Sequence, residues 1–213
     1  LTIGKCEIDC AWTGIGTVNA AVATTRLIER RRPDVIVNFG GAGAHDSDLV
    51  IGDVVIGSRI CAFSAFLVEH SDDICRHGVR GDMGETTMSW KTDHTLNAMA
   101  LHSRCELTPV NGASPDIRCG TIASSDVWID NRSAVRWARR HLGSLCDEME
   151  ASAIAQVASF YRVPLVAIKD ISSSVFLDDN DVESTAHKAP DFAGRNSAIV
   201  AFDVCQTMAD MLP

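Results

Sequence analysis

The stretch MEASAIAQVASFYRVPLVAI (149–168) decides the fold of this chain, because its hydrophobic pattern changes at a single proline. Its first part carries small and apolar residues at helical spacing: Ala151, Ile154, Ala155 and Ala158. This spacing predicts a helix over 149–160. After Pro164, the run LVAI (165–168) is continuously apolar, which is typical of a strand buried on both faces. The stretch therefore predicts a helix followed by a buried strand.

An earlier segment repeats this order of helix, proline and buried strand. Helical spacing predicts a helix over 17–29, and Pro33 precedes the apolar start of a strand expected over 34–39. Helices that alternate with buried strands are the pattern of a parallel sheet with helical crossovers. Further periodic segments predict strands within 49–63 and 119–123 and helices over 93–102 and 192–211. We expect an α/β fold: a single-domain mixed, mostly parallel β-sheet flanked by helices, over residues 1–213.

The composition limits the kinds of partner that the chain can bind. Its 213 residues carry a net charge of -9, so most of the surface repels phosphate groups, and neither nucleic acid nor a membrane surface is an expected partner. No apolar run approaches the roughly 18 residues of a membrane span. The eight cysteines show no C-x-x-C pair or other ligand spacing, which favours free thiols in the cytoplasm. We therefore expect a small-molecule partner and no metal or other cofactor.

The candidate binding residues follow the predicted strands. In open α/β sheets, ligands bind at the carboxyl ends of the parallel strands, where loops diverge and helix N-termini offer free N–H groups. The segments at those ends are GGAGAHD (40–46), SSDVWID (124–130) and SSSVFLDD (172–179), and the acids at 147–150 begin a predicted helix. We expect these four segments to converge on one site.

The glycines at 40–43 do not form a dinucleotide-binding motif. Their spacing is not G-x-G-x-x-G, and a second β-like run replaces the helix that should follow. Two interpretations remain open, namely a tight turn or a close approach of the backbone to a ligand. His45, which follows the glycines, is expected to face solvent or to support the loop.

Three carboxylates lie within the four residues DEME (147–150). Asp147 and Glu148 are well placed to cap the helix and to favour its N-terminal dipole. Glu148 and Glu150 are two positions apart and point in different directions in any regular element. One of them can therefore cap the helix while the other accepts hydrogen bonds from ligand hydroxyl groups.

Four blocks resemble the nucleoside phosphorylase superfamily, and within it the 5'-methylthioadenosine/S-adenosylhomocysteine nucleosidases. They are EMEASAIAQVASFYRVPLVAIKDIS (148–172), GIGTVNAAVATTRLIERRRPDVIVNFGGAGA (14–44), IGDVVI (51–56) and IASSDVWIDN (122–131). The blocks follow the order of the family and cover most of the chain. The resemblance implies a nucleoside phosphorylase-like fold in which the family's first N-terminal strand is not represented.

The resemblance also implies a role for individual residues. Glu150 would bind the ribose 2'- and 3'-hydroxyls, Trp128 would stack on the base, and the remaining substrate-binding positions would be Ala42, Gly43, Ile129, Met149 and Ser172. The implied reaction cleaves an N-glycosidic bond through an oxocarbenium-like state. A carboxylate beside the ribose matches the positive charge of that state better than it matches the neutral substrate.

The sequence departs from the family at the general acid. The family has an Asp after Ile-Ser that helps to protonate the base, but here Ile171-Ser172 is followed by Ser173. A serine hydroxyl does not supply a proton at neutral pH. Asp178 or Asp179 in the next loop is the expected substitute. Asp170 is a weaker candidate than these loop acids, because it lies three positions before Ser173 and should face the other side of a strand.

The acceptor of the sugar separates three functional alternatives. Gly52 stands where hexameric phosphorylases have a phosphate-binding arginine, and Arg59 falls at another offset, so we expect water as the acceptor and a purine nucleosidase. The alternatives are a phosphate-dependent phosphorylase and a nucleoside-binding or storage protein without catalysis. The resemblance further implies a homodimer or higher homo-oligomer, with the segment 69–90 as the expected contact.

Overall fold

The structure is a computed structural model that describes residues 1–63, 66–67, 76–77, 89–176 and 191–212. The helices are α1 (Thr17–Arg31), α2 (His94–Leu101), α3 (Arg132–Leu142), α4 (Ala151–Tyr161) and α5 (Arg195–Met211). The strands are β1 (Thr2–Ile3), β2 (Cys6–Glu7), β3 (Ile36–Ala44), β4 (Val54–Ala62), β5 (Phe66–Leu67), β6 (Arg76–His77), β7 (Ser89–Lys91), β8 (Ile117–Ser124), β9 (Ser144–Glu148) and β10 (Leu165–Ser173).

One mixed sheet of six strands forms the centre of the molecule. Its strand order is β10-β3-β9-β8-β4-β7, and an additional pairing between β10 and β4 joins five of these strands into a closed ring. The longest ladders, β10–β3 and β4–β8, are parallel, whereas the shorter β10–β4, β3–β9 and β4–β7 ladders are antiparallel. The expected α/β fold with a mixed, mostly parallel sheet is confirmed.

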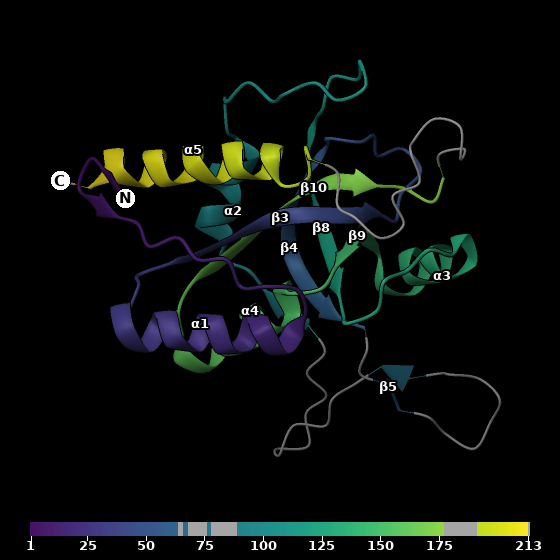
Figure 1. Cartoon of the computed structure of the whole chain (residues 1–213), viewed down its shortest axis with the longest axis horizontal. Helices are drawn as coiled ribbons and strands as arrows, with labels where there is room; N and C mark the ends of the chain where they lie inside the picture. Colours follow the sequence, from purple (N-terminus) through teal and green to yellow (C-terminus); the bar gives the residue numbers. More distant parts are fainter. Residues whose placement is uncertain (64–65, 68–75, 78–88, 177–190, 213) are drawn as a thin grey trace.

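Helices cover the sheet on two sides (Figure 1). Helices α5 and α2 lie above the sheet, and helices α1 and α4 lie below it. Helix α3 lies at the end opposite the chain termini. Strand β10 shows why its sequence is continuously apolar. Leu165 and Ala167 pack into the core on the α1 and α4 side, while Val166 and Ile168 pack against α5 and α2. A strand between two helical layers has no solvent face, which removes the alternation seen in one-sided sheets.

The glycine segment lies inside a strand and does not form a turn. Strand β3 continues through Ala44, and the next strand of the chain, β4, follows without an intervening helix. The interpretation as a tight turn is therefore wrong, and the other interpretation, a close approach of the backbone to a ligand, stays a prediction.

Helix α3 and strand β9 are among the elements that were not anticipated from the sequence. Helix α3 begins at Asn131, whose side chain accepts the N–H groups of Ser133 and Ala134 at 3.0 Å, and it ends at Gly143 in the left-handed conformation. Strand β9 follows at once and contains Asp147 and Glu148. These two acids therefore end a strand. The sequence had indicated that they lie at the start of a helix.

The described residues include no helix long and apolar enough to cross a membrane. They also contain no group of three or more His, Cys, Asp or Glu side chains arranged to hold a metal ion. The described cysteines are free thiols, of which Cys61 and Cys146 are buried.

Candidate active site

Glu150 lies at the junction between β9 and α4, as the N-cap residue of α4. Its Oε1 accepts a hydrogen bond of 2.9 Å from the backbone N–H of Gly16, the residue that precedes α1. Burial raises the pKa of the Glu150 carboxyl, while the Gly16 N–H and the positive charge of Lys169 act in the opposite direction. Glu150 is thus fixed in place by a distant part of the chain, at the carboxyl edge of the sheet.

Glu148 holds the backbone that leads to Glu150. Its carboxylate accepts the N–H of Ala151 at 2.9 Å and the N–H of Glu150 at 3.1 Å, so it supplies the capping that Glu150 itself does not. Its Oε2 also lies 2.9 Å from Nζ of Lys169 on β10. The predicted division of the acids is confirmed in one respect: Glu148 caps the helix, and Glu150 is free of that task.

The N-terminus of α1 joins the loops after β8 and β9. Asp126, at the end of β8, accepts the N–H of Thr17 at 2.7 Å and also the hydroxyl of Thr17. Together with the bond from Gly16 to Glu150, this places two carboxylates at one helix N-terminus, where the dipole favours negative charge. The segments 124–130 and 147–150 therefore meet, as the sequence predicts.

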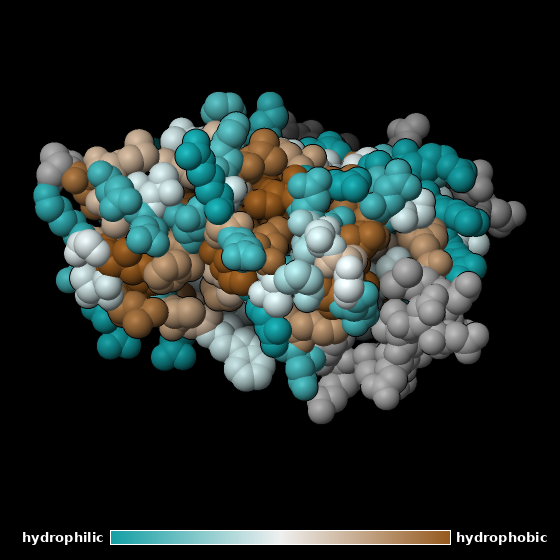
Figure 2. All heavy atoms as spheres, turned by 90° about the horizontal axis from the view of Figure 1, so that it is seen from above, coloured by the Kyte–Doolittle hydropathy of each residue, from teal (hydrophilic) through white to brown (hydrophobic). Residues whose placement is uncertain are grey.

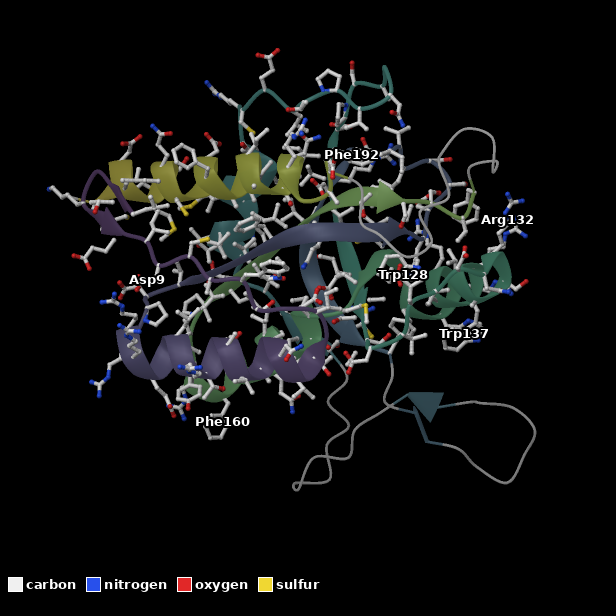
Figure 3. The ribbon with its side chains drawn as sticks, viewed as in Figure 1. Asp9, Trp128, Arg132, Trp137, Phe160 and Phe192 are labelled. Atoms are coloured by element: carbon white, nitrogen blue, oxygen red, sulfur yellow. The ribbon has the colours of Figure 1, made fainter. Side chains whose placement is uncertain are left out.

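The two predicted base-binding residues follow Asp126. The side chain of Trp128 is 57% exposed, and Figure 3 shows it between the ends of the strands and α3. Ile129 packs against a buried cluster that includes Phe63 and Ala138. Trp128 thus presents an open aromatic face beside the carboxyl edge, while Ile129 anchors the loop.

Gly43 lies on β3, between β9 and β10 in the sheet. It pairs with Ser173 of β10 on one side and with Asp147 of β9 on the other. A Cβ atom at Gly43 would lie 2.8 Å from Oδ1 of Asp147 and 3.5 Å from Oγ of Ser173. The glycine is therefore required for a close approach by the Asp147 carboxylate. Beside it, buried Ala42 accepts a 3.3 Å hydrogen bond from the Ser172 hydroxyl.

Asp147, His45 and Ser144 form a buried row that the sequence analysis missed. Nδ1 of His45 lies 2.7 Å from Oγ of Ser144, and Nε2 lies 3.1 Å from Oδ1 of Asp147, an ion-pair contact that is poorly aligned for a hydrogen bond. Of the two placements expected for His45, the one that faces solvent is wrong, since His45 is 1% exposed. Asp147 does not cap a helix, and burial raises the pKa of its carboxyl, although contact with His45 opposes this shift.

Asp170 is excluded from the site for a different reason than the one expected. A bulge at Ser172 shifts the register, so that Asp170 and Ser173 pair with Gly41 and Gly43, which lie on the same face of β3. The expectation that Asp170 and Ser173 face opposite sides is therefore wrong. The Asp170 carboxylate is instead bound by the N–H groups at the start of α5, at 2.8 Å from Gly194 and 2.9 Å from Asn196. Asp178 and Asp179 lie outside the described residues.

Two surface hollows lie away from this edge. One, of about 540 Å³, lies over α5 and is lined in part by Phe202 and Asp203, on the face seen in Figure 2. The other, of about 560 Å³, lies between β7 and the end of α4. The α5 face mixes apolar and polar side chains (Figure 2). Neither hollow contains the carboxylates, the histidine or the exposed tryptophan of the carboxyl edge.

The fold and the arrangement of these residues define an α/β protein whose candidate site lies at the carboxyl edge of a mixed sheet. The family model described as the phosphorylase superfamily matches residues 1–204, and the chain belongs to this superfamily. It is 34% identical over 170 residues to a 5'-methylthioadenosine/S-adenosylhomocysteine nucleosidase of Geobacillus sp., a match that covers 79% of this chain and 68% of the relative. The nucleosidase of the same name from Shewanella piezotolerans is 32% identical, with 86% and 78% covered.

A solved structure agrees with this assignment. The 5'-methylthioadenosine/S-adenosylhomocysteine nucleosidase of Neisseria meningitidis, in complex with methylthio-immucillin-A, superimposes with a TM-score of 0.68 at 28% identity. The match covers 94% of this chain and 80% of that chain.

Proposed function

We propose that the protein hydrolyses the N-glycosidic bond of a purine nucleoside of the 5'-methylthioadenosine/S-adenosylhomocysteine type or of a related nucleoside. The observation that carries the proposal is the position of Glu150, which the Gly16 N–H holds at the carboxyl edge at 2.9 Å. As the ribose gains positive charge during bond cleavage, a fixed carboxylate at its hydroxyls stabilises the transition state more than the substrate. The names of the relatives support the same reaction.

The other site residues receive supporting roles in this proposal. Met149 packs under the sugar, and Ala42, Gly43 and Ser172 line its other side. The exposed indole of Trp128 stacks on the base, which its accessible face allows. Ile129 offers its backbone to the base, because its side chain is fixed in the core.

Water is the proposed acceptor of the sugar, as opposed to phosphate. Arg59 is the arginine nearest to the block in which phosphorylases bind the anion, but here its Nη2 donates to the carbonyl of Leu142 at 2.6 Å. Its Nε lies 3.4 Å from the hydroxyl of Thr121. These bonds hold the guanidinium group against β8 and the end of α3. Arg59 therefore supports the packing of these elements and is not directed at a phosphate.

A chromatographic assay tests the function. Purified protein incubated with 5'-methylthioadenosine should release adenine equally with and without phosphate. Strict dependence on phosphate would establish the phosphorylase alternative. Binding in calorimetry without any released base would establish the nucleoside-binding or storage alternative.

We further propose that residues 1–213 act as one nucleosidase-like domain in a cytoplasmic homo-oligomer, at least a homodimer. Apolar side chains on and before α1 are unusually exposed: Trp12 at 91%, Ile15 at 69% and Val18 at 73%. They adjoin the loop of Trp128, which Asp126 ties to α1. We name Trp12, Ile15, Val18 and Val22 the α1 patch and propose it as the self-association surface. Most of the segment 69–90, the contact expected from the sequence, lies outside the described residues.

A further inference from the structure

The cleavage of a purine nucleoside needs a proton donor for the departing base, and Ser173 does not provide one. We propose that Asp147 is this donor, so that the catalytic acid of this protein lies on β9, across Gly43 from the serine on β10. This inference rests on the proposed function and names the residue that completes it.

The position of Gly43 between the two strands supports this assignment. Asp147 and Ser173 are the cross-strand partners of the same glycine, so their side chains lie on the same face of the sheet. Because Gly43 has no side chain, the Asp147 carboxylate extends over it, to 2.8 Å from the place a Cβ atom would occupy. A carboxylate on β9 can therefore serve a ligand that lies over Gly43 and Ser173.

Three other described acids of this edge are held by partners of their own. Lys169 and two N–H groups hold Glu148, Thr17 holds Asp126, and the start of α5 holds Asp170. Glu150 is three residues from Asp147, a separation of at most about 10 Å of chain. One nucleoside can therefore contact both groups, with its ribose at Glu150 and its base at Asp147.

Two features prepare Asp147 for this task. Its side chain is 12% exposed, so the carboxyl group is mostly removed from water but not completely buried. Burial raises the pKa of the Asp147 carboxyl and so favours the protonated form that a general acid needs. His45, held by Ser144 at 2.7 Å, contacts Oδ1 at 3.1 Å and positions the carboxyl group. His45 is therefore a positioning residue.

The proposed step balances as follows. The protonated Asp147 gives its proton to N7 of the purine, the bond between C1' and N9 breaks, and its electron pair stays with the base. Water then bonds to C1', and the proton that it loses restores Asp147. The products are the free base and the free sugar, and no further reactant is needed.

The test compares two leaving groups on one variant. Asp147→Asn keeps the shape of the side chain but carries no acidic proton. We expect kcat/KM for 5'-methylthioadenosine to fall about 10²- to 10⁴-fold, the usual contribution of a general acid. Hydrolysis of p-nitrophenyl β-D-riboside should change less than about threefold, because nitrophenolate leaves without protonation. Equal losses on both substrates, or no loss on the nucleoside, would overturn the assignment.

A second variant places the acid on the other strand. In the Asp147→Asn background, Ser173→Asp should raise kcat/KM for the nucleoside at least about tenfold above that of Asp147→Asn alone, since both positions flank Gly43. Failure to recover would contradict the shared location. The matched control is Asp9→Asn, which removes a carboxylate that pairs with Arg31 at 2.7 Å and should leave both activities unchanged. If wild-type protein cleaves neither substrate, the proposed function itself is wrong, a result distinct from a selective failure of Asp147.

Discussion

Oε2 of Glu148 lies 2.9 Å from Nζ of Lys169, and both side chains are only 2% exposed. This buried ion pair joins β9 to β10 directly beneath the chain that carries Glu150. Because Glu148 also accepts the N–H groups of Glu150 and Ala151, the pair orients the start of α4 as well as neutralising its own charges. We therefore expect the pair to support both the fold and the position of Glu150.

Lys169→Met should destabilise the protein strongly. The substitution leaves the carboxylate of Glu148 buried without its counter-ion, and the loss of one partner of such a pair typically costs about 3–5 kcal/mol. Denaturant unfolding followed by circular dichroism measures the change. The double variant Glu148→Gln with Lys169→Met is the control, because it removes both charges and should recover at least half of the loss. A single variant as stable as the wild type would contradict this role.

The sequence could predict the layers of the fold and the different surroundings of Glu148 and Glu150, because both depend on local patterns. The periodicity around Pro164 and Pro33 predicted helices and buried strands that the structure contains. The spacing within residues 147–150 separated Glu148 from Glu150, and the structure gives these two side chains different partners. Lys169 was a further local signal that was not used, because a charge within a continuously apolar strand indicates a buried partner.

What the sequence could not predict depends on contacts between distant strands. The row of His45, Ser144 and Asp147 exists only because β3 and β9 pair with each other, and no spacing along the chain indicates that pairing. The bulge at Ser172 similarly reversed the expected facing of Asp170, since one extra residue shifts the alternation of a strand. Such irregularities carry no recognisable residue pattern here.

Glu150→Gln should remove most of the activity without unfolding the protein. The amide keeps an oxygen to accept the Gly16 N–H, so the local structure persists, but it cannot stabilise positive charge on the ribose. We expect kcat to fall about 10²-fold or more, while nucleoside affinity in calorimetry changes less. A variant that keeps wild-type kcat would show that Glu150 does not act on the transition state.

Activity should be lost on acidification at a pH above the usual pKa of a glutamate side chain. The proposed function requires ionised Glu150, and burial raises the pKa of this carboxyl, so activity should fall as the pH drops through that raised pKa. Stability changes in the opposite sense, because the native state binds this proton more tightly than the unfolded chain. The stability that this proton contributes is fully present below the pKa of Glu150 in the unfolded chain. It is lost as the pH rises through the pKa of Glu150 in the folded protein. Glu150→Gln should therefore gain stability relative to the wild type between pH 4 and pH 7, measured by thermal unfolding. If the difference in stability between the variant and the wild type stays the same across this pH range, the raised pKa of Glu150 is contradicted.

Gly43→Ala should impair catalysis by displacing Asp147. The new Cβ would lie 2.8 Å from Oδ1, too close for an unmoved carboxylate, and small misplacements of a catalytic group can cost about 10²-fold in rate. Steady-state kinetics with 5'-methylthioadenosine measures the loss. In the Asp147→Asn background the same substitution should cost much less, because the acid is already absent. Additive losses would mean that Gly43 acts independently of Asp147.

Val18→Asp should dissociate the proposed homo-oligomer. Val18 is 73% exposed, and Val22, one helical turn further along α1, is 54% exposed, so both lie on the same side of the α1 patch. A carboxylate buried at the centre of an apolar contact would be left without a partner, which disfavours association. Sedimentation velocity should show an oligomer for the wild type and a monomer for the variant. Phe202→Asp is the matched control, because Phe202 is apolar and 57% exposed but lies on α5, across the sheet from α1. If only Phe202→Asp dissociates the oligomer, the contact lies on the α5 face and the α1 patch is the wrong surface. If the wild type is a monomer, the proposed homo-oligomer is wrong.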